Sequence, residues 1–145
     1  MLFNKLVRTI SAAAAVATLA LAAGCATGQR SSHTRVVSEN ATVINLSEVD
    51  ARMRAQPTQP TQVQRIYEQD GATMMLRHFE RGAFVPDHTV PGTVIAHVLQ
   101  GQLEITIGEQ AHTVSEGQVL VMEPHTEHNV RAIEASRMLL TIAAD

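Results

Sequence analysis

From residue 41 onward, apolar residues come in short runs that glycine and proline interrupt at close intervals. The clearest run is 102–107, where Leu103, Ile105 and Ile107 alternate with polar residues, as in a strand with one buried face. The other runs of strand-like composition are 41–46, 62–68, 72–80, 111–114, 119–122, 129–134 and 136–143. The pattern therefore predicts a chain made almost entirely of short strands.

Turn and helix signals complete this pattern. Asp70-Gly71, between two of the runs, is a strong signal for a tight hairpin. Ser47 and Asp50 have the spacing of a capping box, which predicts a brief helix before the prolines that follow residue 56. Many short strands with one brief helix predict an all-β sandwich or a closed barrel, since closure leaves no exposed sheet edge.

The first residues have a different composition from the rest. Two basic residues, Lys5 and Arg8, precede the apolar, alanine-rich run 9–23. This order of charged, apolar and small segments predicts a secretory signal peptide, and the run is short for a membrane-spanning helix.

The segment that ends at Cys25 resembles the lipobox of bacterial lipoproteins, in which the cysteine is lipidated and becomes the new N-terminus. Leu21 stands one position further from the cysteine than is usual in that motif. By the sorting rule of such lipoproteins, Ala26 after the cysteine implies the periplasmic side of the outer membrane. The alternative is a secreted or soluble periplasmic protein in which Cys25 is a plain thiol.

Length and charge limit the remaining possibilities. The 145 residues allow one domain behind the leader. A net charge of -3 and an aromatic content of 3% argue against a nucleic-acid partner. We therefore expect a signal peptide over 1–24, a lipid-anchored flexible tether over 25–40, a strand, helix and proline-rich loop over 41–61, and a barrel over 62–145.

Two blocks of the expected barrel resemble the two motifs of the cupin superfamily. In the first motif, Gly82, His88 and Gly101 match the two glycines and the first histidine. Val90 and Val94 stand where the motif has its second histidine and its glutamate. The second motif keeps its last histidine; its positions are Gly117, Glu123, Pro124, His125, His128 and Ala132. The resemblance implies a double-stranded β-helix, or jelly-roll, barrel, and it implies that cupins of this size commonly form homodimers.

In that family, three histidines and one glutamate hold a metal ion inside the barrel. Of this set only His88 and His128 are present here, with His125 and Glu127 as possible extra ligands. The resemblance thus implies at most a weakened site for one divalent ion, iron, manganese, zinc or nickel, because each lost ligand weakens binding. His78 and His112, on strands with polar neighbours, are expected at the surface.

Two functions follow as alternatives. The first is a periplasm-facing, lipid-anchored protein that binds a small molecule in its barrel, in a pocket lined by His88, Val90, Val94 and His128. The second, by resemblance, is a metal-dependent enzyme of the dioxygenase, decarboxylase or isomerase type. An acid-base catalyst that uses His128 without a metal is a further form of the enzyme hypothesis. The catalytic residues are otherwise undefined by the sequence.

Overall fold

The computed structural model describes residues 34–38, 41–55 and 59–144. The predicted signal peptide, Cys25 and most of the predicted tether lie outside these residues. Strands and helix follow one another as β1 (Thr34–Ser38), β2 (Ala41–Ile44), α1 (Leu46–Ala55), β3 (Thr61–Gln69), β4 (Ala72–Phe79), β5 (Phe84–His88), β6 (Thr93–Gln100), β7 (Gln102–Ile107), β8 (Gln110–Ser115), β9 (Val119–Met122), β10 (His128–Ala132) and β11 (Ser136–Ala143).

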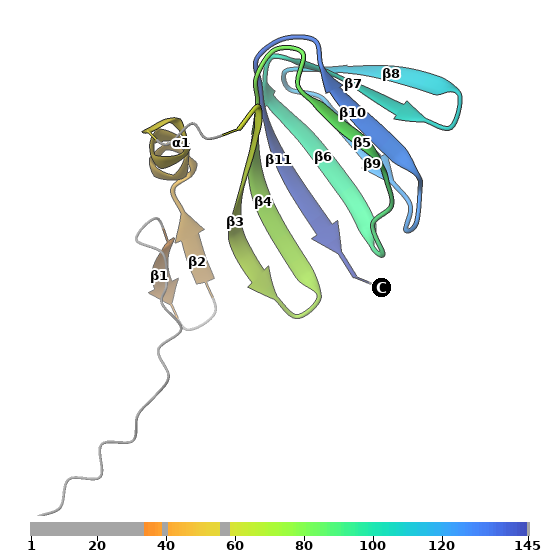
Figure 1. The fold of residues 1–145 in the computed structure, drawn as a ribbon. Helices are drawn as coiled ribbons and strands as arrows, with labels where there is room; N and C mark the ends of the chain where they lie inside the picture. The colour runs from red at the N-terminus through yellow and green to blue at the C-terminus, as the bar shows by residue number, and fades with distance from the viewer. Residues whose placement is uncertain (1–33, 39–40, 56–58, 145) are drawn as a thin grey trace, which may run out of the picture.

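Two antiparallel sheets form the body of the molecule (Figure 1). One has five strands in the order β3-β4-β11-β6-β9, and the other has four in the order β5-β10-β7-β8. The predicted all-β jelly-roll barrel with one short helix is confirmed. No helix within the described ranges is long and apolar enough to cross a membrane.

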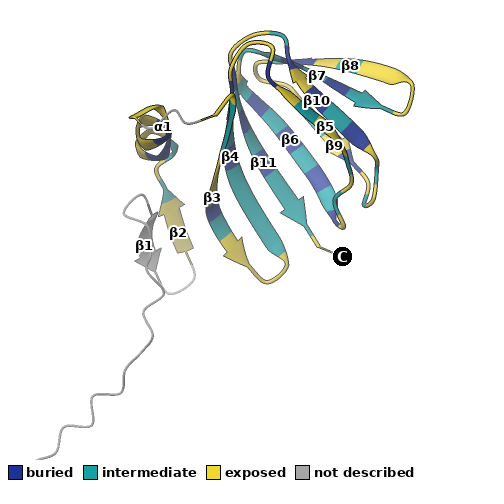
Figure 2. Ribbon diagram, in the orientation of Figure 1, coloured by how far each residue is buried: buried dark blue, intermediate teal, exposed yellow. Residues whose placement is uncertain are grey.

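The main core lies between the two sheets, and it follows from the two-residue period of the strands. On β6, Val94, Ala96 and Val98 are buried while the residues between them are half-buried on the opposite face. Leu103 and Ile105 on β7 meet them from the other sheet. Figure 2 shows the same alternation of buried and less buried bands along these strands. This core fixes which side chains of each strand point into the barrel.

Helix α1 covers part of the outer face of the five-stranded sheet. Val49 and Met53, one turn apart, are buried there against Ile66 and Leu76. The predicted capping box is displaced: the side chain of Asn45, instead of Ser47, accepts hydrogen bonds from the amides that open the helix, and Glu48 accepts one from the Asn45 amide group at 2.8 Å. Asn45 precedes the helix directly, so its oxygen reaches two amides that have no partner within the helix.

The predicted hairpin between β3 and β4 is confirmed. Asp70 and Gly71 both have positive φ, 48° and 80°, which is the backbone of the tight turn that this dipeptide favours. Gly101, in the turn from β6 to β7, has φ 79°, and a Cβ there would lie 2.4 Å from the carbonyl oxygen of Ala135. Only glycine fits that position without displacing the neighbouring turn.

Strand β1 lies inside the segment for which a flexible tether was predicted. Thr34–Ser38 pairs antiparallel with Ala41–Ile44 of the same chain. Part of the predicted tether thus has regular secondary structure. The predicted strand in the early run 41–46 is thus present, and it pairs within its own chain.

Candidate functional site

Two histidines far apart in the sequence meet on one wall of the barrel. His88 ends β5 and His128 begins β10, and these residues are direct partners across the antiparallel pair. Their ring centroids are 4.3 Å apart. His128 is only 4% exposed, whereas His88 is half-buried. The pair is therefore set into the wall with one member reachable from outside.

Both rings are oriented by the same local contact. Nδ1 of His88 lies 2.8 Å from the carbonyl oxygen of Pro86, and Nδ1 of His128 lies 2.8 Å from that of Thr126. A carbonyl oxygen only accepts hydrogen bonds, so Nδ1 carries the proton in each neutral ring. Nε2 of each ring is then the nitrogen with a free lone pair. The pair can accept hydrogen bonds or contribute two nitrogen ligands.

Two valines at positions of the first motif belong to the core or pack against it. Val94 belongs to the buried core, and Val90 packs against it. These are the two positions at which the metal motif has a histidine and a glutamate. Neither valine has a polar side chain, so these two positions offer nonpolar contact and no metal ligand.

A third polar side chain faces the same interior. Arg77 on β4 lies directly opposite Met138 on β11, and Met138 is buried in the main core. Its guanidinium carbon lies 5.4 Å from the centroid of the Phe79 ring, and its Nε is buried without a hydrogen-bond partner. Among the described residues, no carboxylate forms an ion pair with it. Arg77 was not singled out from the sequence, although alternation along 72–80 places it on the face of Phe79.

The electrostatics of the barrel follow from this placement. Burial, above all, lowers the pKa of His128; the hydrogen bond to Thr126 opposes this, and the positive charges of a protonated His88 and of Arg77 add to it. Burial also lowers the pKa of Arg77. A neutral imidazole beside an unpaired guanidinium is therefore the stable state at neutral pH.

The residues present do not fit a tightly held resident metal ion. In the described part of the chain, no three histidine, cysteine, aspartate or glutamate side chains come together as a metal-binding group. His125 and Glu127 are both exposed and do not complete such a group with the histidine pair. His125 has a positive φ of 61° and donates its backbone amide to the carbonyl oxygen of Val90 at 2.7 Å. Two imidazoles alone leave most of the coordination sphere to other ligands.

A separate charged cluster lies on the outer face of the five-stranded sheet. Asp50 of α1 is 1% exposed, and its carboxylate contacts Arg54 of the same helix. His78 Nε2 lies 2.6 Å from Oδ1, and Arg137 Nη1 lies 2.9 Å from Oδ2. Since His78 and Arg137 are cross-strand partners on β4 and β11, one carboxylate joins the helix to two strands.

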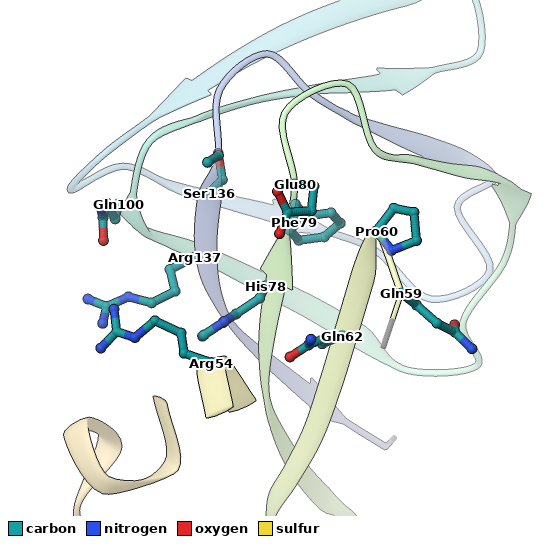
Figure 3. Close-up of a pocket in the computed structure, with 11 residues that line it drawn as sticks. Arg54, Gln59, Pro60, Gln62, His78, Phe79, Glu80, Gln100, Ser136 and Arg137 are labelled. Atoms are coloured by element: carbon teal, nitrogen blue, oxygen red, sulfur yellow. The ribbon is translucent and has the colours of Figure 1, made fainter. Parts of the chain in front are cut away.

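This cluster borders a cavity of about 410 Å³ (Figure 3). Arg54, His78 and Arg137 form one side, with Glu80 and Ser136 among the other lining residues. His78 is thus a partly buried member of an ion-pair network, contrary to its expected surface position. Burial lowers the pKa of His78 more than the attraction of Asp50 raises it. The helix that supplies Asp50 could not be placed on this face from strand periodicity.

The other histidines lie on strand faces. His97 of β6 alternates with the buried Ala96 and Val98, so it is on the outer face. His112 of β8 is the cross-strand partner of Ile105, which is buried in the core, so its position is on the inner face at the sheet edge. The expectation of a surface position for His112 is thus met only in part, because the residue is half-buried.

Comparison with known proteins agrees with this geometry. Residues 75–143 match the family model described as a cupin domain. No curated protein matches the sequence. Residues 75–143 are therefore similar in sequence to a cupin domain, and they lie on a fold of the cupin type.

Solved structures show how far the likeness extends. The Cnp3 cupin domain of Schizosaccharomyces pombe is 18% identical, with a TM-score of 0.63 over 77% of this chain and 86% of that one. A conserved protein of unknown function from Streptococcus pyogenes is 23% identical, with a TM-score of 0.59 over 79% and 96%. An RmlC-like cupin from Desulfovibrio desulfuricans is 28% identical, with a TM-score of 0.53 over 57% and 81%. These similarities establish the fold.

Proposed function

We propose that this cupin-domain protein binds a small molecule at the wall of its barrel formed by His88 and His128. The observation that carries the proposal is the pair of Nε2 atoms, both free to accept, on two rings whose centroids are 4.3 Å apart. Such a pair selects a ligand that donates hydrogen bonds, such as one with hydroxyl groups. Val90 and Val94 supply the apolar contact beside it.

The buried position of His128 supports a binding role. A ligand hydroxyl that donates to Nε2 of His128 would add a hydrogen bond, which contributes about 0.5–1.5 kcal/mol net. The half-buried His88 gives the ligand a way in from solvent. A barrel interior with few polar groups in fixed orientation is the common form of a small-molecule site.

The test is mass spectrometry of the small molecules retained by the intact protein, repeated for His88→Phe and His128→Phe. Both variants keep an aromatic ring and lose the accepting nitrogen. We expect a retained molecule in the wild type and its loss in both variants. The control is His97→Phe, on the outer face of β6, which should retain it. Retention by all three variants would contradict the proposed site.

A metal-dependent enzyme is the second candidate, and the same two nitrogens favour it. Two adjacent Nε2 atoms, with each Nδ1 held by a carbonyl oxygen, are oriented as metal-bound histidines usually are. An ion held there would need its other ligands from water or substrate. Metal analysis of protein purified without chelator tests this: a stoichiometric divalent ion, absent from His88→Ala and His128→Ala, would favour the enzyme over plain ligand binding.

We also propose that a lipid on Cys25 holds the protein at the periplasmic side of the outer membrane. The support is the sequence alone, through the order of charged, apolar and small residues before the cysteine. Detergent-phase partitioning of the full chain tests the proposal. The wild type should enter the detergent phase and Cys25→Ser should remain in the aqueous phase.

Self-association as a homodimer remains a proposal. Its support is a pair of exposed valines on the outer face of β9, Val119 at 51% and Val121 at 62%. Val121 is the cross-strand partner of Ile95. A Val121→Glu substitution should shift the sedimentation coefficient from that of a dimer to that of a monomer, and a wild type that sediments as a monomer would contradict the proposal.

A further inference from the structure

We infer that Arg77 makes the barrel site specific for a hydroxy acid, with the ligand carboxylate on Arg77 and its hydroxyl groups on His88 and His128. The inference rests on the proposed function, and it adds the chemical class of the ligand. It depends on the placement of one arginine in a largely apolar interior.

The strand register places Arg77 inside the barrel. Its cross-strand partner on β11 is Met138, which is 2% exposed within the main core. Phe79, two residues further along β4, is also 2% exposed and lies under the guanidinium. Residues that are two positions apart on a strand lie on the same face of the sheet, so the side chain of Arg77 points inward, as that of Phe79 does.

The charge of Arg77 is not balanced by the protein. No ion pair with it occurs among the described residues, and its buried Nε has no hydrogen-bond partner. The stacking on Phe79 offsets only part of the cost, since a cation over an aromatic ring contributes roughly 0.5–2 kcal/mol. A charge in a largely apolar interior is normally paired or bound to a ligand of opposite charge, and a ligand anion would supply that partner to the half-buried Arg77.

Arg77 and the histidine pair together define two complementary requirements. Nε2 of each neutral histidine accepts hydrogen bonds, which demands donors on the ligand. The guanidinium only donates and carries a positive charge, which demands an acceptor of negative charge, and its planar fork matches a carboxylate. Hydroxyl groups and a carboxylate on one small molecule meet both requirements, and that molecule is a hydroxy acid.

The outer face of the barrel offers a matched control. Arg131 on β10 also stacks on a phenylalanine, with its guanidinium carbon 4.9 Å from the Phe84 ring centroid, but both residues are exposed. Arg77→Gln and Arg131→Gln therefore remove the same charge and the same kind of stacking, one inside the barrel and one outside.

The experiment uses two trios of probes: lactate, 1,2-propanediol and propionate, and gluconate, sorbitol and hexanoate. Within each trio, one member has hydroxyl and carboxylate groups, one has hydroxyl groups only and one has a carboxylate only. Affinities are measured by NMR titration of the wild type and of Arg77→Gln, Arg131→Gln, His88→Phe and His128→Phe. Thermal melting checks that each variant is folded, and Arg77→Lys, which keeps the charge, replaces Arg77→Gln if that variant does not fold.

We expect the hydroxy acid of at least one trio to bind the wild type at least tenfold more tightly than either partner compound. Arg77→Gln should weaken that binding at least tenfold and leave the affinity for the diol or polyol unchanged. Arg77→Lys should lose part of the preference for the compound with a carboxylate. Arg131→Gln should leave all these affinities unchanged. In His88→Phe and His128→Phe, the hydroxy acid should bind no more tightly than propionate or hexanoate.

Two other results would overturn the inference, and they differ in whether the proposed ligand site at the two histidines still stands. A polyol that binds as tightly as the hydroxy acid, with loss in the histidine variants and no effect of either Arg77 variant, would overturn the role of Arg77 and keep the histidine site. Absence of binding by all six probes at 50 mM, roughly the weakest affinity that a specific site would show, would overturn the inference together with the proposed ligand site.

Discussion

Outside the barrel, loss of the Asp50 carboxylate should lower the free energy of unfolding more than loss of any other charged group, and Asp50→Asn tests this. Asp50 is 1% exposed and receives Arg54, His78 and Arg137 from three elements. Asparagine has nearly the same shape and keeps one oxygen, so the packing around it changes little. The substitution removes the negative charge and half of the acceptor capacity.

The magnitude follows from how exposed the partners are. Removal of one member of a fully buried ion pair costs about 3–5 kcal/mol, because the other charge is left without a partner. The side chains of Arg54 and Arg137 are 63% and 30% exposed, so water can solvate both after the change. We therefore expect a loss of about 2 kcal/mol in the free energy of unfolding, near the lower end of what hydrogen bonds to a charged group supply.

The assay is urea denaturation followed by circular dichroism, with thermal melting beside it. For a domain of this size, a loss of about 2 kcal/mol corresponds to a fall in melting temperature of roughly 8 °C. The control is Asp87→Asn, since Asp87 is exposed and accepts only one side-chain hydrogen bond among the described contacts, from Asn129 at 2.8 Å. It should cost less than about 0.5 kcal/mol.

The reasoning would be refuted by an Asp50→Asn protein as stable as the wild type. Greater stability of Asp50→Leu than of the wild type would show that desolvation of the carboxylate outweighs its three contacts. A second readout is the pKa of His78, measured by NMR. Asp50 raises that pKa against the larger effect of burial, so it should fall further in Asp50→Asn.

Three further predictions concern the barrel. Burial holds the pKa of His128 below its value in the unfolded chain. The stability that this neutral histidine contributes should therefore be full above about pH 6.5, the unfolded value, and should decrease as pH falls through the folded pKa. Urea midpoints between pH 5 and 8 measure this, and the same dependence of the midpoint on pH in His128→Phe would contradict it. Gly101→Ala should cost at least about 2 kcal/mol more than Gly108→Ala, since both have positive φ but only Gly101 has atoms in the way of a Cβ; equal denaturation midpoints would contradict the clash. Removal of divalent metal by chelator should change the melting temperature by less than about 1 °C, because two imidazoles hold an ion weakly, and a large fall would reveal ligands beyond the pair.

Much of the fold was readable from local pattern. The alternation of 102–107, the continuous apolar run of 119–122 and the Asp70-Gly71 turn each specify a strand or hairpin within a few residues, and the structure has all three. The helix was placed correctly but its start was not, because Ser47 and Asn45 are both good capping residues and only the path of β2 into the helix decides between them.

The candidate site was readable only in part. His88 and His128 were found because each stands at the end of a strand-like block that resembles a family motif. Arg77 has no such signal: an arginine on a strand is usually solvated, and its inward position depends on which face of β4 meets β11. Whether the site binds a ligand or a metal stays a prediction.

The sequence by itself determined the succession of strands along the chain, the tight turns and which residues of a strand share an apolar face, because these depend on side-chain period and backbone conformation over a few residues. Only the tertiary structure decided that two imidazoles forty residues apart share one wall, that Arg77 faces the same interior without a carboxylate partner among the described residues, and that Asp50 is buried in contact with two arginines and a histidine. Those contacts depend on how two sheets and one helix close on one another, and no local interaction specifies that closure.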